Sequence, residues 1–281
     1  NYVKQGGKVV FISDHYNADR NLNRIDSSEA MNGYRRGAFD DMSKGMTNDE
    51  KHSKAMQDVK SSDWLSNQFG VRFRYNALGD MNTKNIVSSD ESMGITKGID
   101  SVSMHAGCTL AITDPNKAKG IVYTPSHLSS KHKWSHAVDQ GVYNNGGVEE
   151  GPYVAISKLG KGKAVFIGDS SLVEDRSPKY KREDTGENKK TYNGFHEEDN
   201  GKLLTNITQW MSKEDTSTSL KDSIIKLDRK TTLHQFEQPQ QSTEPEKEPW
   251  SQPPSGYKWY DPSTFKAGSY GSQHQHNTQT D

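Results

Sequence analysis

The stretch Gly160-Lys161-Gly162-Lys163-Ala164-Val165-Phe166-Ile167-Gly168-Asp169-Ser170-Ser171 decides the fold of this chain. Its glycine-rich start predicts a turn, and the apolar run that follows, which has no polar alternation, predicts a strand buried on both faces. Such strands are typical of parallel sheets covered by helices, in which functional groups lie just beyond the carboxyl ends of the strands. We therefore expect Asp169, Ser170, Glu174 and Asp175 to lie where chemistry or binding takes place.

A second stretch, near the start of the chain, repeats this pattern. The residues Gly6-Gly7-Lys8 precede the apolar run Val9-Val10-Phe11-Ile12, and Ser13-Asp14-His15 follow it. If these two strands lie side by side and parallel, their carboxyl ends meet at one edge of the sheet. Asp14, His15 and Asp169 should then line one crevice.

The other apolar patterns predict the remaining elements of an α/β domain. Helical spacing is expected within residues 28–36, 50–69 and 200–211. Strands are expected at 71–75, 99–104, 109–113 and 120–124, and a hairpin is expected to pair 152–157 with 164–167. We predict a three-layer α/β/α fold with a mainly parallel, flavodoxin-like sheet over residues 1–213. Residues 1–7 read as the end of a helix, so the first elements of this domain are expected before residue 1.

The composition of the chain changes after Ser212. Residues 214–281 are rich in Ser, Thr, Pro and Gln, and such a segment cannot bury enough apolar surface to order itself alone. We predict an irregular tail that docks on the main domain or on a partner. Its expected anchors are the aromatic residues Trp250, Tyr257, Trp259, Tyr260 and Phe265.

Charge and cysteine usage narrow the function classes. The chain of 281 residues has 37 acidic and 36 basic residues, so no net field attracts nucleic acid or an anionic membrane. The sequence has no apolar run that would span a membrane. The single cysteine, Cys108, excludes an internal disulfide, and sparing cysteine use favours a secreted or cell-surface bacterial protein.

Four features, in this order along the chain, carry a resemblance to a known family. They are a helix end followed by Gly6-Gly7-Lys8 and a strand, the motif Gly94-Ile95-Thr96-Lys97-Gly98-Ile99, Leu159-Gly160-Lys161-Gly162-Lys163 with a strand that ends in Gly168-Asp169-Ser170-Ser171, and the closing segment 200–211 with Gln209-Trp210-Met211 at its end. Over residues 1–213 the chain resembles the class I glutamine amidotransferase-like superfamily. Within it, the trehalose-utilisation-like branch and the gliding-motility and ABC-transporter accessory branch are the most similar.

The tail resembles that of exported Firmicute proteins labelled DNA-binding, in which an oligonucleotide-binding barrel precedes this domain. The resemblance implies that nucleic acid, if it is a partner, is contacted through a domain outside this sequence. It does not imply glutaminase activity, because the family's nucleophile lies in a Gly-x-Cys-x-Gly elbow. Here Ala106-Gly107-Cys108-Thr109-Leu110 lacks the second glycine. A buried thiol is the simpler interpretation of Cys108.

Two hypotheses for the crevice follow. In the first, the domain is a non-catalytic ligand-binding or scaffolding module of a larger exported protein. Its ligand would be held by the residues of the two strand ends together with arginines of the polar insertion 17–48, namely Asp14, His15, Arg20, Arg24, Asp169, Ser170 and Ser171. Arginine forks suit a phosphate or sugar. Alternatively, the arginine side chains hold the insertion together through hydrogen bonds to its own backbone.

In the second hypothesis, the protein is a metal-dependent hydrolase of a phosphate- or sugar-containing substrate. A divalent cation would be bound by Asp14, His15, Asp169 and Asp175, and a bound water would act as nucleophile. The alternative is that these acids cap turns and helices, because Asp and Ser after a strand are ordinary N-cap residues.

Overall fold

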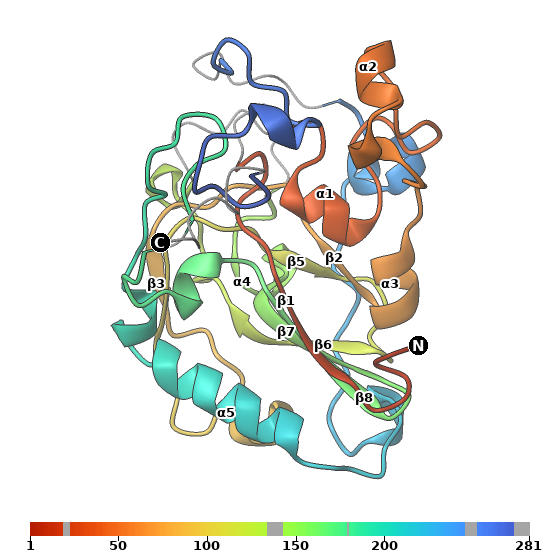
Figure 1. Cartoon of the computed structure of the whole chain (residues 1–281). Helices are drawn as coiled ribbons and strands as arrows, with labels where there is room; N and C mark the ends of the chain where they lie inside the picture. Colours follow the sequence, from red (N-terminus) through yellow and green to blue (C-terminus); the bar gives the residue numbers. More distant parts are fainter. Residues whose placement is uncertain (19–22, 134–142, 179, 245–251, 273–281) are drawn as a thin grey trace.

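The computed structural model describes residues 1–18, 23–133, 143–178, 180–244 and 252–272. Its strands form one four-stranded sheet and two two-stranded sheets (Figure 1). The strands are β1 (Lys8–Ile12), β2 (Val71–Phe73), β3 (Met81–Thr83), β4 (Val102–Met104), β5 (Leu110–Ile112), β6 (Ala118–Tyr123), β7 (Pro152–Leu159) and β8 (Gly162–Ile167). The α-helices are α1 (Ser27–Asn32), α2 (Asn48–Lys51), α3 (Trp64–Phe69), α4 (Gly147–Glu150) and α5 (Asn200–Ser212).

The four-stranded sheet contains both strands that the sequence analysis paired. Its order is β1-β8-β7-β6, and β1 runs parallel to β8 with Lys8 opposite Lys163 and Ile12 opposite Ile167. The backbone N–H of Ser13 continues the ladder to the Ile167 carbonyl at 3.0 Å. The prediction that the two apolar runs lie side by side and end at one edge is therefore confirmed. The predicted hairpin is confirmed too, as the antiparallel pair β7–β8.

The prediction of a mainly parallel, flavodoxin-like α/β/α fold is wrong. Among the paired strands of the described ranges, β1–β8 is parallel, whereas β7–β8, β6–β7, β2–β5 and β3–β4 are antiparallel. The fold is a mixed, β-rich one with few helices, and α5, with 13 residues, is the longest helix described. The apolar run of β8 indicates that both faces of this strand are buried. Burial of both faces does not depend on whether the neighbouring strands run parallel or antiparallel to it.

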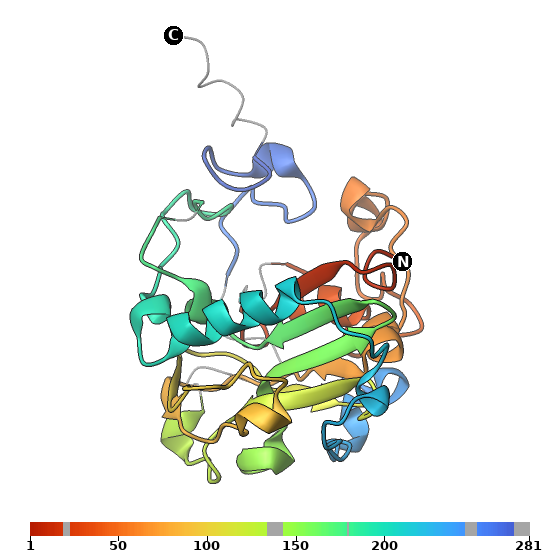
Figure 2. The same ribbon diagram turned by 90° about the horizontal axis from the view of Figure 1, so that it is seen from below.

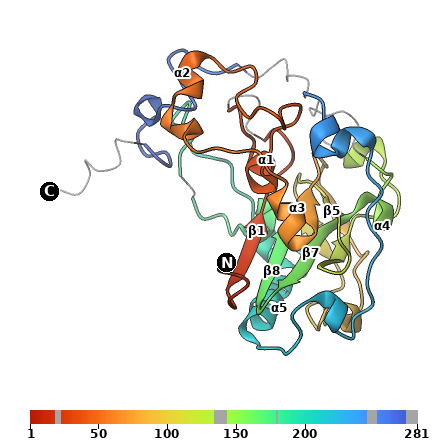
Figure 3. The ribbon, with the colours of Figure 1, turned by 90° about the vertical axis from the view of Figure 1, so that its right-hand side faces the viewer.

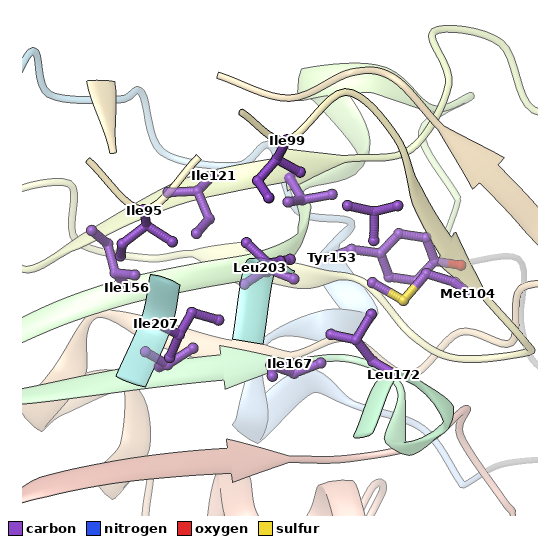
Figure 4. Packing of buried hydrophobic residues seen from close by; sticks show 14 of the residues in the cluster. Ile95, Ile99, Met104, Ile121, Tyr153, Ile156, Ile167, Leu172, Leu203 and Ile207 are labelled. Carbon is purple, nitrogen blue, oxygen red and sulfur yellow. The ribbon is translucent and has the colours of Figure 1, made fainter. Parts of the chain in front are cut away.

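One face of the sheet packs against α5. Ile167 from β8 and Ile156 from β7 meet Leu203 and Ile207 of the helix in one buried cluster (Figure 4). These helix residues, four apart, lie on one face of α5, and Figure 2 shows α5 lying along the green strands. The C-terminal end of α5 is tied to β8, because Lys163 Nζ donates to the Trp210 carbonyl at 2.6 Å.

The opposite face packs against α3 and the pair β2–β5. Phe166 of β8 stacks on Phe11 of β1 with ring centroids 5.2 Å apart, and the edge of Phe69 from α3 meets Phe166 at 5.6 Å. Besides the short helix α3, strands and irregular segments cover this face of the sheet (Figure 3). The predicted helix over residues 50–69 is broken, because Asp58 has φ of 60°, which a continuous right-handed helix does not allow. No helix in the described ranges has the length and apolar character needed to cross a bilayer.

Part of the tail is built into the domain rather than attached to it. Leu220 and Ile225 are buried. Asp228 accepts hydrogen bonds from the Lys119 ammonium at 2.8 Å and from the Gly120 backbone at 2.9 Å. The described part of the tail has the short 3-10 helices η6 (Leu220–Asp222), η7 (Gln235–Glu237), η8 (Pro239–Gln241) and η9 (Pro262–Thr264). It docks on the domain itself.

A buried ion triad holds this part of the tail in place. The Arg74 guanidinium, 1% exposed, contacts Glu150 Oε2 at 2.8 Å and Glu237 Oε1 at 2.7 Å, and the two carboxylates are 0% and 6% exposed. Burying such charges is costly, and removal of one partner leaves an uncompensated charge in the interior. The triad therefore makes residues 214–244 part of the folded unit.

We expect Glu237→Ala to lower the free energy of unfolding by about 3 kcal/mol, because part of the Arg74 charge then lies buried without its partner. The measurement is urea unfolding followed by circular dichroism. Glu244→Ala is the control: it removes an exposed ion pair with Lys44, 3.4 Å apart, and should cost no more than about 1 kcal/mol. Equal effects of the two substitutions would contradict the structural role of the tail.

Candidate functional site

The carboxyl ends of β1 and β8 open into a cleft of about 380 Å³. Five of the residues predicted for the site line it together, namely Asp14, His15, Asp169, Ser170 and Ser171. The prediction that the two strand ends share one pocket is therefore confirmed as a matter of geometry. Glu174 lies among the lining residues as well, so three carboxyl groups belong to this cleft.

Other predicted residues lie elsewhere. Arg24 turns into its own insertion, where Nε lies 3.3 Å from Glu50 Oε1 and Nη2 donates to the Gly45 carbonyl at 3.1 Å. Arg24 is therefore a residue that stabilises the insertion, which was the alternative interpretation. Arg20 falls outside the described residues. Asp175 is exposed and accepts the backbone N–H of Ser177 at 3.0 Å, as a turn-capping residue does.

The backbone at Gly168 fixes where the cleft floor begins. A Cβ at this position would lie 1.9 Å from the Cys108 carbonyl oxygen, and the Cys108 N–H donates to the Gly168 carbonyl at 2.9 Å. The segment after β4 therefore crosses the end of β8 at a distance that only glycine allows. Cys108 itself is buried, and burial raises the pKa of its thiol well above the usual value.

Asp169 ties this crossing together. Its carboxylate accepts the backbone N–H of His105 at 2.7 Å and that of Ser171 at 2.9 Å, and it also accepts the Ser171 hydroxyl. The side chain is 1% exposed. Asp169 thus caps the 3-10 helix η4 (Ser170–Val173) and joins the end of β8 to the segment after β4.

Ser170 joins the two strand ends from the cleft side. Its hydroxyl lies 3.1 Å from Asp14 Oδ2 and 3.4 Å from Glu174 Oε1, so it can donate to either. Asp14 also accepts the backbone N–H of His15 at 2.9 Å, and Glu174 accepts that of Tyr192 at 2.6 Å. Each carboxylate is therefore held in one orientation by donors of the chain.

Both aspartates have raised pKa values. Burial raises the pKa of Asp169 well above its usual value, and the neighbouring charge of Asp14 raises it further. Burial likewise raises the pKa of Asp14, an effect that the charge of His15 partly offsets and that of Glu174 reinforces. Burial and a nearby like charge both disfavour the ionised form of a carboxyl group.

His105 forms the rim next to Asp169. Its Nε2 lies 2.5 Å from Glu197 Oε2, and its ring stacks on that of Tyr192 with centroids 4.6 Å apart. Its Nδ1 lies 3.3 Å from Asp80 Oδ2. The next residue, Ala106, also lines the cleft and has φ of 51°, in the left-handed region that side chains rarely adopt.

Sequence reasoning missed several lining residues. The apolar patterns and strand-end motifs do not connect Ser27, His105, Lys189 or Lys190 with the strand ends, yet all four line the cleft. The available signal was the placement of Tyr180 and Tyr192 around this lysine pair, since aromatic residues interleaved with basic ones are typical of binding surfaces.

Three of the four predicted metal ligands, Asp14, His15 and Asp169, line the cleft, but lining it does not make them a ligand set. Within the described ranges, no three His, Cys, Asp or Glu residues are grouped so that they could hold a metal ion. Asp169 is surrounded by donors of the chain, and Asp175 is not among the residues that line the cleft. Carboxylates that accept backbone N–H groups have fewer lone pairs for a cation.

Comparison with known proteins adds little. No family model and no curated protein matches the chain. One solved structure, described as "mmIFT52 N-terminal domain", is 11% identical, with a TM-score of 0.40 over 77% of this chain and 69% of that chain. A likeness this low carries no argument about fold or function, so the resemblance to the amidotransferase-like superfamily stays a prediction.

We expect wild-type protein to lose stability relative to Asp14→Asn as the pH rises from about 4, the ordinary range of an aspartate. The raised pKa of Asp14 stabilises the folded state below the unfolded pKa, and this contribution is lost as the pH passes the folded pKa. The measurement is the free energy of unfolding of both proteins between about pH 3.5 and about pH 8. The lower limit lies about half a unit below the ordinary pKa of an aspartate, and the upper limit lies well above it.

Asp175→Asn is the control, with the opposite sign. Hydrogen bonds from the Ser177 side chain and backbone lower the pKa of Asp175, so wild type should lose stability relative to this variant only as the pH falls below about 4. A difference between wild type and Asp14→Asn that stays constant with pH would refute the assignment of a raised pKa.

Proposed function

We propose that this domain is a non-catalytic ligand-binding module whose cleft takes a small, polar molecule rich in hydroxyl groups. One observation carries the proposal: Asp14 and Asp169 come from two parallel strand ends, and Ser170 joins the ends at the floor of a cleft of about 380 Å³. Pockets of about 300–1,000 Å³ suit small molecules. The strand ends of a sheet are also where such ligands bind in many folds that contain parallel pairs.

The chemistry of the lining supports a hydroxylated ligand. Ser13, Ser27 and Ser170 supply hydroxyl groups that both donate and accept hydrogen bonds, and Asp14 and Glu174 supply acceptors. The rings of Tyr180 and Tyr192 offer flat apolar faces to the C–H groups that such molecules also carry.

The hydrogen-bond network favours binding over chemistry. Asp169 accepts donors from His105 and Ser171, Glu174 accepts one from Tyr192, and Asp14 accepts one from His15. Groups held in this way are preorganised, which lowers the entropy lost when a ligand binds. Nothing in the described part of the chain specifically favours the metal-dependent hydrolase. Export and a nucleic-acid partner stay predictions.

The test is a thermal-shift and calorimetric screen of wild-type protein with hexoses, pentoses and linear polyols. A ligand at about 100 times its Kd should stabilise the folded state by about 2.7 kcal/mol. We expect Asp14→Asn to weaken binding of any hit by about tenfold or more, since a hydrogen bond to a charged group is worth about 1.5–3 kcal/mol.

Asp175→Asn is the matched control, because it removes the same charge outside the cleft and should leave Kd unchanged. The proposal fails if no compound of the screen binds wild type. It fails equally if Asp14→Asn and wild type bind every hit with the same Kd.

A further inference from the structure

We infer that the ligand of this cleft carries a phosphate group, and that it is bound by the part of the cleft wall that Lys189 and Lys190 form. This inference rests on the proposed function and names the chemical class of its ligand: a hydroxylated phosphate monoester. Both lysines line the cleft, together with Tyr180 and Tyr192. All four residues lie in a second insertion, residues 174–199, between β8 and α5.

The lysines stand on an ordered hairpin. Lys181 and Asn188 form an antiparallel bridge, and the Arg182 N–H donates to the Glu187 carbonyl at 2.8 Å. At the tip, Arg182 Nη2 lies 2.7 Å from the buried carboxylate of Asp184. Tyr180 and Lys189 lie just outside this bridge on its two strands. A hairpin closed in this way presents their side chains in a defined position.

Each ammonium group rests on an aromatic ring. Lys189 Nζ lies 4.5 Å from the centroid of Tyr180, and Lys190 Nζ lies 4.7 Å from that of Tyr192. Among the described residues, no carboxylate forms an ion pair with either lysine. Lys189 Nζ also donates to the Tyr180 hydroxyl at 3.4 Å. A cation–π contact fixes an ammonium group and leaves its other N–H donors able to bind an anion.

The positive charge of the two lysines favours a ligand with a negatively charged group. Two adjacent ammonium groups favour a dianion over a monoanion, and a phosphate monoester carries a charge of about −1.5 to −2 near pH 7. The hydroxyl of Ser170 and the carboxylates of Asp14 and Glu174 suit the hydroxylated part of the same molecule, and the two carboxylates repel its phosphate. The cleft therefore orients such a ligand with its phosphate toward the hairpin.

The C-terminal segment supports this wall. The Lys266 N–H donates to the Glu183 carbonyl at 3.0 Å, and Tyr270 contacts Tyr180 with ring centroids 5.7 Å apart. The same segment reaches the first insertion, where Trp259 Nε1 donates to Glu50 Oε1 at 3.1 Å. Figures 1 and 2 show this dark-blue segment between the two insertions. It thus links the hairpin to the insertion that follows β1.

The experiment compares glucose, glucose 6-phosphate and inorganic phosphate by isothermal calorimetry on the full chain. We expect wild type to bind glucose 6-phosphate at least about tenfold more tightly than glucose, with an affinity that falls as NaCl is raised. Lys189→Ala/Lys190→Ala should remove this preference, and Lys189→Arg/Lys190→Arg should keep it. Lys226→Ala/Lys230→Ala, the same charge change on exposed residues outside the cleft, should also keep it.

Three results would overturn the inference: equal binding of glucose and its phosphate by wild type, an intact preference in the double alanine variant, or no binding of either phosphate compound. Thermal midpoints of the unliganded variants check that each is folded. If glucose and glucose 6-phosphate bind equally while Asp14→Asn weakens both, the phosphate inference fails and the proposed function stands. If Asp14→Asn has no effect on any binding either, both fail.

Discussion

The structure depends on the parallel pairing of β1 with β8. In this register Ile12 lies opposite Ile167, so both chains leave the sheet at the same edge and each reaches an aspartate two residues later. A shift of one residue would turn each side chain to the other face of the sheet. The burial of Phe11 against Phe166 on one face, and of Ile167 against α5 on the other, opposes such a shift. Packing on both faces of the sheet therefore sets the geometry of the carboxyl pair.

Local hydrogen bonds offset part of the cost of bringing two carboxyl groups together. Asp169 is buried where the backbone of His105 and Ser171 can donate to it, and Gly168 allows the close crossing that brings His105 there. The raised pKa values of Asp14 and Asp169 show that these donors do not cancel the burial and the mutual repulsion. Such groups are more common at functional sites than elsewhere, because a site needs polar groups where folding alone would not place them.

Residues that look like appendages in the sequence complete the domain. The triad of Arg74, Glu150 and Glu237 joins the tail to the sheet edge, and the Asp228 carboxylate covers the Lys119 ammonium of β6. The hairpin with Lys189 and Lys190 supplies one wall of the cleft. Each of these contacts joins residues far apart in the chain, and charged residues without an apolar pattern give no sign of such partners.

The sequence by itself determined the two buried strands, the hairpin of β7 and β8, the closing helix α5 and the convergence of Asp14, His15, Asp169, Ser170 and Ser171. Local apolar patterns and strand-end motifs suffice for these, since they depend on neighbours in the chain and on one pairing. Tertiary structure alone decided the direction of the other strands, the break in the predicted helix at 50–69, the inward turn of Arg24 and the place of Lys189. A buried strand has the same composition beside a parallel or an antiparallel neighbour, and a charged side chain has its role set by the partner that folding brings to it.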